Sequence, residues 1–267
     1  MTLVALAGNS ESMTESMIAV DGGEVWADDS GGDGRPLVLL HPGVGDSRIW
    51  APILPALTPK YRVIRYDDRG FGHSPAPRVK YSLLSDLVAV LDHYGLDQVA
   101  LVGCSQGGGS SLGLALAQPS RVAAIALLCP GVPGFPYPEE PEIEAAYGAA
   151  TTVDEVAAVM LGIWGRSGAT PEAMEQFRSA ARAAIDGEGM ATDDPPVFER
   201  LGEITVPTSL LVGDADNPAL IESNKQAAAR IPGCEFSLVP GMDHLPPLRE
   251  PDLVIHTITA TLARAAW

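Results

Sequence analysis

The sequence is short of several kinds of residue, and each shortage narrows the classes of protein to consider. Among its 267 residues only 17 are Lys or Arg, against 34 Asp or Glu, so the formal net charge is −17. This charge repels the phosphates of nucleic acids and the anionic surface of membranes, so neither is expected as a partner. No apolar run approaches the roughly 20 residues that cross a bilayer. We interpret the acidic balance as a source of solubility rather than as a sign of a cationic substrate.

Cysteine is also scarce, with Cys104, Cys129 and Cys234 as the three examples. Their number is odd and their spacing is unlike that of a metal site, so we expect reduced thiols in a cytoplasmic protein. The first residues, about 1–15, lack the basic segment and the long apolar segment of a secretory signal. They are predicted to form a loose leader.

What the sequence does have is a large apolar fraction, 46% hydrophobic residues against 19% charged ones, which is enough for a sizeable core. Short apolar runs alternate with helical patterns, as in α/β domains. Several runs are almost continuously apolar, which is typical of parallel strands buried on both faces. The runs that predict strands are 24–28, 36–41, 61–67, 98–103, 121–129, 207–213 and 234–240. The patterns between them that predict helices are 81–96, 105–120, 218–233 and 251–266.

The stretch 133–199 interrupts this alternation. It opens with a Pro-rich connector and contains helical patterns at 153–165 and 171–187 but no convincing strand. We predict a helical cap there, inserted into a core domain made of 1–132 and 200–267. Its large apolar side chains could line a substrate cavity, but for each one taken singly we favour packing of its helix onto the core; they are Met160, Trp164, Met174 and Phe177.

The segment Gly103-Cys104-Ser105-Gln106-Gly107 has the pattern G-x-S-x-G between a predicted strand and a predicted helix. In that context the pattern indicates a sharp turn that presents the middle residue as a nucleophile. Glycine is needed on both sides because a larger side chain would clash. We therefore predict Ser105 as the nucleophile and expect Cys104 to point into the sheet.

A serine nucleophile needs a base. His244 follows the last predicted strand, where a loop reaches the carboxyl ends of the strands, and open α/β sheets place their sites there. His93 and His256 fall within helical patterns, and His41 and His73 are weaker candidates. We predict His244 as the base.

The base needs a carboxylate to orient it, and the site needs donors for an oxyanion. Asp214 and Asp216 both follow a predicted strand, and either could orient the imidazole while the other caps the next helix. One oxyanion donor is predicted to be the backbone N–H of Gln106. The second is expected from the loop after 36–41, where Pro42 has no N–H and Gly43 or Val44 remains.

Several segments together resemble the α/β-hydrolase fold superfamily in its single-domain form with a helical cap. They are LLHPGVGDSRIW (39–50), YDDRGFGHS (66–74), GCSQGG (103–108), PTSLLVGDAD (207–216) and PGMDHLPPLREP (240–251). The resemblance implies an eight-stranded, mostly parallel, doubly wound sheet. It also implies Asp216 as the triad acid, His244 as the base, a structural role for His41 and Gly43 as the second oxyanion donor, with Val44 as the fallback. Pro42 departs from the family, which usually has Gly there.

The identity of the nucleophile limits the reaction. Relatives that are dehalogenases or epoxide hydrolases carry Asp at the position of Ser105, so both activities are disfavoured. We predict a serine hydrolase of small, fairly apolar carboxylic esters or lactones, acting through an acyl-enzyme on a small molecule. No cofactor or metal is implied, and the oligomeric state is not indicated. The alternatives are a C–C bond hydrolase or perhydrolase with the same triad and, in another class, a non-catalytic ligand-binding or regulatory protein.

Overall fold

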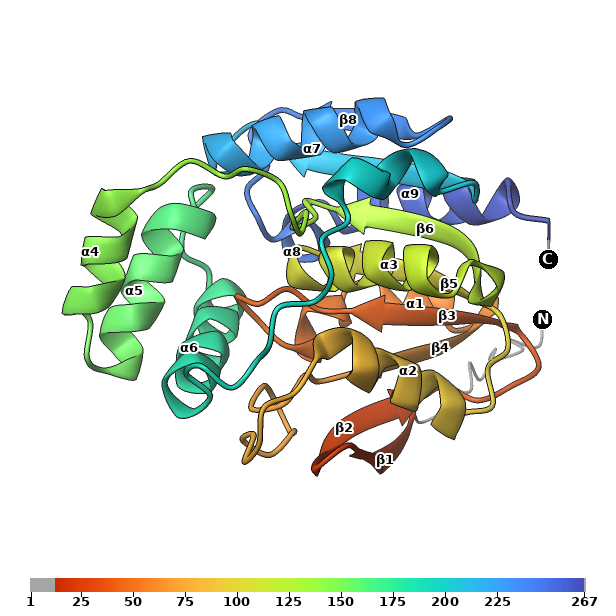
Figure 1. Cartoon of the computed structure of the whole chain (residues 1–267), viewed down its shortest axis with the longest axis horizontal. Helices are drawn as coiled ribbons and strands as arrows, with labels where there is room; N and C mark the ends of the chain where they lie inside the picture. Colours follow the sequence, from red (N-terminus) through yellow and green to blue (C-terminus); the bar gives the residue numbers. More distant parts are fainter. Residues whose placement is uncertain (1–12, 267) are drawn as a thin grey trace, which may run out of the picture.

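The computed structural model describes residues 13–266, which form one eight-stranded sheet flanked by helices (Figure 1). The strands are β1 (Thr14–Val20), β2 (Gly23–Asp29), β3 (Arg35–Leu40), β4 (Tyr61–Tyr66), β5 (Val99–Cys104), β6 (Val122–Leu128), β7 (Thr208–Gly213) and β8 (Glu235–Val239). The longer helices are α2 (Leu83–His93), α3 (Gln106–Ala117), α4 (Pro141–Ala149), α5 (Val153–Trp164), α6 (Pro171–Asp186), α7 (Pro218–Arg230) and α9 (Pro251–Ala263). Short turns of helix are η1 (Ser47–Trp50), α1 (Leu54–Leu57), η2 (Pro119–Arg121), η3 (Phe198–Glu203) and α8 (Pro246–Arg249).

The strand order across the sheet is β1-β2-β4-β3-β5-β6-β7-β8. The pairs β1–β2 and β2–β4 are antiparallel, and all other neighbours are parallel. Helices α2, α3 and α7 cover the near face in Figure 1, and α1 and α9 cover the far face. The predicted mostly parallel, doubly wound eight-stranded sheet is confirmed.

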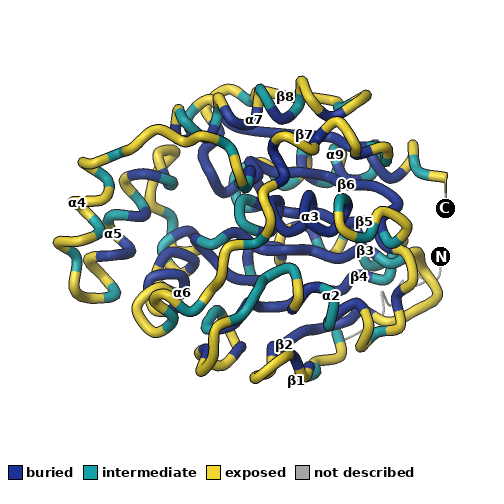
Figure 2. Tube along the Cα trace, viewed as in Figure 1, coloured by how far each residue is buried: buried dark blue, intermediate teal, exposed yellow. Residues whose placement is uncertain are grey.

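Burial on both faces explains why the central strands are so apolar. Every residue of β5, β6 and β7 is buried, and the dark tube in Figure 2 runs through the middle of the sheet. Side chains on both faces of these strands pack against helices, so alternation with polar residues is absent. At the edge, β8 has mostly exposed residues.

The register brings the loops of the predicted site to one edge of the sheet. Leu40, the last residue of β3, pairs with Tyr66 on one side and with Gly103 on the other. Cys104 in turn pairs with Leu128, and Leu128 pairs with Leu211. The loops after β3, β4, β5, β6 and β7 therefore all leave the sheet at its carboxyl edge, where open α/β sheets place ligands.

Helices α4, α5 and α6 lie between β6 and β7 in the chain and beyond the carboxyl ends of the strands in space (Figure 1). The helical patterns at 153–165 and 171–187 correspond to α5 and α6. Side chains of Thr152 and Thr170 cap these two helices by accepting backbone N–H bonds.

Apart from the short turns of helix, helix α4 and strand β1 have no counterpart among the predicted elements. Helix α4 has no buried residues, so it needs no apolar face that a sequence pattern could reveal. Strand β1 begins at Thr14, inside the predicted leader, and most of that leader lies outside the described residues. Over residues 13–266, no helix combines the length and the apolar character that a membrane crossing requires.

Candidate active site

Ser105 occupies a strained turn between β5 and α3. Its backbone has φ 49° and ψ −113°, outside the regions that L-residues ordinarily adopt. Three backbone bonds hold the turn, because Ser105 donates its N–H to Leu128 and its carbonyl accepts from Gly109 and Gly131. The strain is thus fixed by the sheet and the following helix, as is typical of functional turns.

The glycines on either side allow this turn to pack. A Cβ on Gly103 would collide with the carbonyl of Gly107, and a Cβ on Gly107 would collide with the carbonyl of Leu40. Gly107 also donates its N–H to the carbonyl of His41 at 3.2 Å. Helix α3 therefore begins in direct backbone contact with the end of β3, and its N-terminus points at the carboxyl edge of the sheet.

His244, in the loop after β8, and Asp216, in the loop after β7, lie side by side. The Nδ1 atom of His244 donates to Oδ2 of Asp216 at 2.8 Å, and both side chains are almost completely buried. The other carboxylate oxygen of Asp216 accepts the backbone N–H of Asn217 at 2.7 Å. These bonds fix the imidazole with Nδ1 protonated and leave Nε2 as the nitrogen with a free lone pair.

Asp214, the other candidate acid, binds the backbone of another loop and not the imidazole. Its Oδ1 atom accepts the N–H of Gly241 at 2.6 Å, and the residue is exposed. Gly241 has φ 72° in the turn after β8. Asp214 therefore ties the two loops together at the surface and does not contact His244.

Trp164, at the end of α5, contacts His244 twice. Its carbonyl accepts the backbone N–H of His244 at 3.1 Å, and its ring centroid lies 4.5 Å from that of the imidazole. Its indole N–H donates to the hydroxyl of Tyr147 at 3.3 Å. Within residues 13–266, Ser105 and His244 share no hydrogen bond.

The loop after β3 is held by the ring of His41. His41 donates Nδ1–H to the carbonyl of Pro42 at 2.9 Å and accepts the N–H of Asp68 at Nε2, also at 2.9 Å. The side-chain amide of Gln106 donates to Asp68 at 2.9 Å. A Cβ on Gly43 would lie 2.9 Å from Oε1 of the same amide, so the predicted oxyanion residues Gly43 and Gln106 are neighbours.

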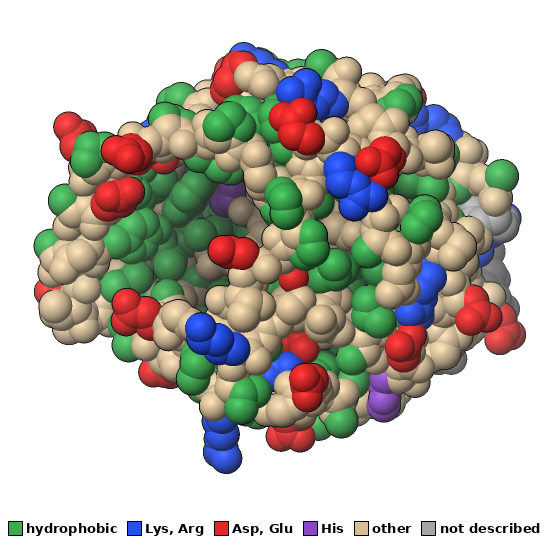
Figure 3. All heavy atoms as spheres, in the orientation of Figure 1, with side chains coloured by type: hydrophobic (Ala, Val, Ile, Leu, Met, Phe, Trp, Pro, Cys, Tyr) green, Lys and Arg blue, Asp and Glu red, His purple; other side chains and the backbone are tan. Residues whose placement is uncertain are grey.

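A cavity of about 890 Å³ opens above Ser105. Figure 3 shows the hollow, with hydrophobic side chains inside it. Of the predicted substrate-binding residues, Met160 and Trp164 line it, together with Gly43, Val44 and Gln106. Phe177 does not, because it is fully buried and packs where α6 passes Gly165.

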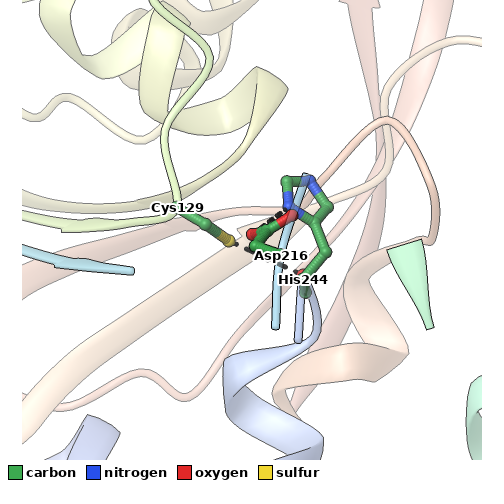
Figure 4. A group of neighbouring side chains, drawn as sticks. All are labelled: Cys129, Asp216 and His244. Carbon is green, nitrogen blue, oxygen red and sulfur yellow. Dashed lines mark hydrogen bonds and ion pairs between the residues drawn. The ribbon is translucent and has the colours of Figure 1, made fainter. Parts of the chain in front are cut away.

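Cys129 forms a buried cluster with His244 and Asp216 (Figure 4). One ligand atom from each of Cys129, Asp216 and His244 lies within 4.8 Å of the others, a donor set that suits zinc. The Asp216–His244 bond already engages two of these atoms. Burial raises the pKa of the Cys129 thiol well above its ordinary value, so the group stays protonated. The sulfur of Cys104 lies 3.7 Å from that of Cys129, in the packing of the sheet.

Sequence reasoning did not identify Gln176 on α6. Gln176 is buried and forms two hydrogen bonds with Asp46 in the loop after β3. Its Oε1 accepts the Asp46 N–H at 2.8 Å, and its Nε2 donates to Asp46 Oδ1 at 3.3 Å. A Cβ on Gly45 would collide with the same amide. One glutamine thus anchors α6 on the loop that carries Gly43. A glutamine on an otherwise apolar helical face was the only available signal.

Comparisons with known proteins agree with this architecture. A family model described as the alpha/beta hydrolase fold matches residues 35–161. The carboxylesterase CesB of Bacillus subtilis superposes with a TM-score of 0.82 and 20% identity, covering 96% of this chain and 93% of that one. Est816, described as an N-acyl homoserine lactone degrading enzyme, superposes with a TM-score of 0.77 and 27% identity, covering 92% and 99%.

Among curated proteins, the pimeloyl-[acyl-carrier protein] methyl ester esterase of Legionella pneumophila is 42% identical over 97 residues. That match covers 35% of this chain and 37% of the relative. The chain spans about two fifths of the length of the curated relatives it matches.

Proposed function

Because this chain has the α/β-hydrolase fold, we propose that it is a serine hydrolase of small, fairly apolar carboxylic esters or lactones. The observation that carries the proposal is the strained backbone of Ser105, at φ 49°, in the wall of a cavity. Strain of this kind persists only where the surrounding structure enforces it, and it is common where a side chain must be presented for chemistry.

In this proposal each residue has one role, and the His244–Asp216 hydrogen bond supports the pairing of base and acid. Ser105 Oγ attacks the substrate carbonyl while His244 Nε2 takes its proton, and Asp216 holds the imidazole and balances the imidazolium charge. The backbone N–H groups of Gln106 and Gly43 receive the oxyanion. Collapse of the tetrahedral intermediate expels the alcohol, which takes the proton from His244. A water deprotonated by His244 then cleaves the acyl-enzyme and restores the serine.

Residues 133–199 act as the cap in this proposal and set the choice of substrate. Met160 and Trp164 line the cavity from α5. The similarity to an N-acyl homoserine lactone degrading enzyme over most of both chains, and to a methyl ester esterase over a shorter stretch, supports esters and lactones as the substrates to test first.

The test is a panel of p-nitrophenyl esters, aliphatic lactones and vinylogous diketones, assayed with the wild type and with Ser105→Ala. We expect turnover of short to medium acyl esters or lactones that is lost in Ser105→Ala. If only the diketones were cleaved, the result would favour C–C bond hydrolysis over ester or lactone hydrolysis. A folded protein that turns over none of them would favour a ligand-binding role.

A further inference from the structure

The cavity above Ser105 has an uneven distribution of charge. Glu140, Asp193 and Asp194 are among the residues that line it, and in the described chain the lining includes no Lys or Arg. Figure 3 shows acidic side chains at the edge of the hollow. A substrate entering this cavity therefore meets carboxylates without compensating cations.

Glu140 is held close to the triad loop. It immediately precedes α4, and its Oε1 atom accepts the side-chain amide of Asn217 at 3.0 Å. Asn217 is buried, caps α7 and follows Asp216 directly. An amide donor orients a carboxylate without cancelling its charge, and within residues 13–266 Glu140 forms no ion pair.

The other two carboxylates lie on a segment anchored to the start of α2. Asp194 accepts the hydroxyl of Ser82 at 2.6 Å and the N–H of Leu84 at 3.1 Å. Thr192 donates its N–H to the carbonyl of Tyr81 at 2.7 Å, which fixes the same segment. Asp193 is exposed between these anchored residues and is likewise free of ion pairs to the described basic side chains. These hydrogen bonds hold the segment that carries the carboxylates of Asp193 and Asp194 in place at the cavity.

Aromatic rings supply a second, independent feature. Tyr137, Tyr147 and Trp164 all line the cavity. The faces of such rings attract ammonium groups, and this attraction grows when the cation is partly desolvated. Carboxylates combined with aromatic rings favour a cation, and the described lining has no Lys or Arg to pair with a carboxylate at the far end of an acyl chain.

From these features we propose that the cavity selects substrates by charge, a claim that rests on the proposed esterase function. It takes acyl esters whose far end is cationic or uncharged and rejects those whose far end is a carboxylate. Glu140 and Asp193 are the residues that impose the selection. Acyl groups ending in a carboxylate are therefore excluded from its substrate class.

The test uses three p-nitrophenyl esters of equal length whose acyl chains end in trimethylammonium, tert-butyl or carboxylate. We expect kcat/KM for the cationic ester to exceed that for the anionic ester at least about tenfold at low salt, with the ratio shrinking as salt screens the charges. Glu140→Gln and Asp193→Asn should each lower the ratio several-fold. Glu139→Gln is the control. It removes the charge of the neighbouring residue, which does not line the cavity, and it should keep the wild-type ratio.

A binding measurement separates failure of this inference from failure of the proposed function. Calorimetry on Ser105→Ala with hexyltrimethylammonium and with heptanoate needs no turnover, and we expect only the ammonium ion to bind measurably. Equal affinity for the two ions, or a kinetic ratio that Glu140→Gln and Asp193→Asn leave unchanged, would overturn the charge selection. A protein that binds the ammonium ion but cleaves no ester would support selection by charge and would contradict the proposed esterase function.

Discussion

The indole ring of Trp164 lies 4.5 Å from the imidazole of His244, and the Trp164 carbonyl accepts the His244 backbone N–H at 3.1 Å. The two residues belong to segments far apart in the sequence, the end of α5 and the loop after β8. Trp164 also lines the cavity. One residue therefore contacts both the proposed base and the space where substrate would bind, so helix α5 helps to set the orientation of the imidazole.

Trp164→Ala should lower kcat/KM by about ten- to a hundredfold, because small displacements of a catalytic group cost rates of that order. The backbone bond survives the change, so the folded state should persist. Trp164→Phe keeps an aromatic surface against the imidazole and should retain most activity. Steady-state kinetics on a p-nitrophenyl ester, with circular dichroism to verify folding, measure both. Wild-type rates in Trp164→Ala would show that the ring does not position the base.

Asp216→Asn should reduce kcat by about three to four orders of magnitude, since an amide at this position favours the wrong imidazole tautomer. Asp214→Asn is the matched control, because Asp214 binds the N–H of Gly241 and not the histidine. Because Asn can still accept that N–H and the site is exposed, the control should cost less than about 1 kcal/mol of stability and little rate. Pre-steady-state and thermal unfolding measurements separate the two effects. A larger loss of kcat in Asp214→Asn would reassign the acid.

Gly107→Ala should destabilise the protein by about 3 kcal/mol or more, because the added Cβ would collide with the rigid backbone carbonyl of Leu40. Gly113→Ala, on the same helix, is the control. Its Cβ would lie 3.7 Å from Leu84, an ordinary contact, and alanine raises helix propensity by up to about 1 kcal/mol. Urea unfolding followed by fluorescence measures both. Equal stability of the two variants would contradict the close approach of α3 to β3.

The ion pair between buried Asp46 and half-buried Arg48 predicts a dependence of stability on pH. Burial alone raises the pKa of Asp46, but hydrogen bonds, mainly from Arg48 and also from Ser179, outweigh it and lower that pKa from 3.8 to about 2. A lowered pKa in the folded state stabilises the fold above the unfolded pKa. That stability is lost as pH falls through the folded value, and the shift corresponds to about 2 kcal/mol.

Arg48→Met should therefore cost at least about 2 kcal/mol at pH 7, and its difference from wild type should shrink between pH 4 and pH 2. Arg178→Met removes an exposed ion pair with Asp154 and should cost less than about 1 kcal/mol at any pH. Chemical unfolding at several pH values provides the comparison. A cost of Arg48→Met that stays constant down to pH 2 would show that Asp46 is not the linked group.

Local patterns explain which parts of the fold the sequence could predict. The turn at Ser105 is recognisable because a buried strand, two glycines and a helix follow one another in a few residues, and strands β2 to β8 are apolar enough to stand out. Strand β1 is not, because its exposed Met17 and polar neighbours belong to an edge strand with one buried face. Pairing with β2, rather than its own composition, defines it.

The features that the sequence could not predict depend on contacts between distant segments. Gln176 reaches Asp46 across 130 positions, and nothing in α6 alone indicates that partner. Phe177 and Met160 are both large apolar residues on helices, yet only Met160 lines the cavity. The difference depends on how α5 and α6 pack, which helical periodicity does not specify.

The most direct test of the central claim is labelling with a fluorophosphonate probe, which reacts only with an activated serine. We expect the wild type to be labelled, mass spectrometry to place the adduct on Ser105, and Ser105→Ala to abolish labelling while Cys104→Ala keeps it. His244→Ala should slow labelling severely, because the hydroxyl loses its base. A folded wild-type protein that stays unlabelled, or an adduct on any other residue, would contradict the account.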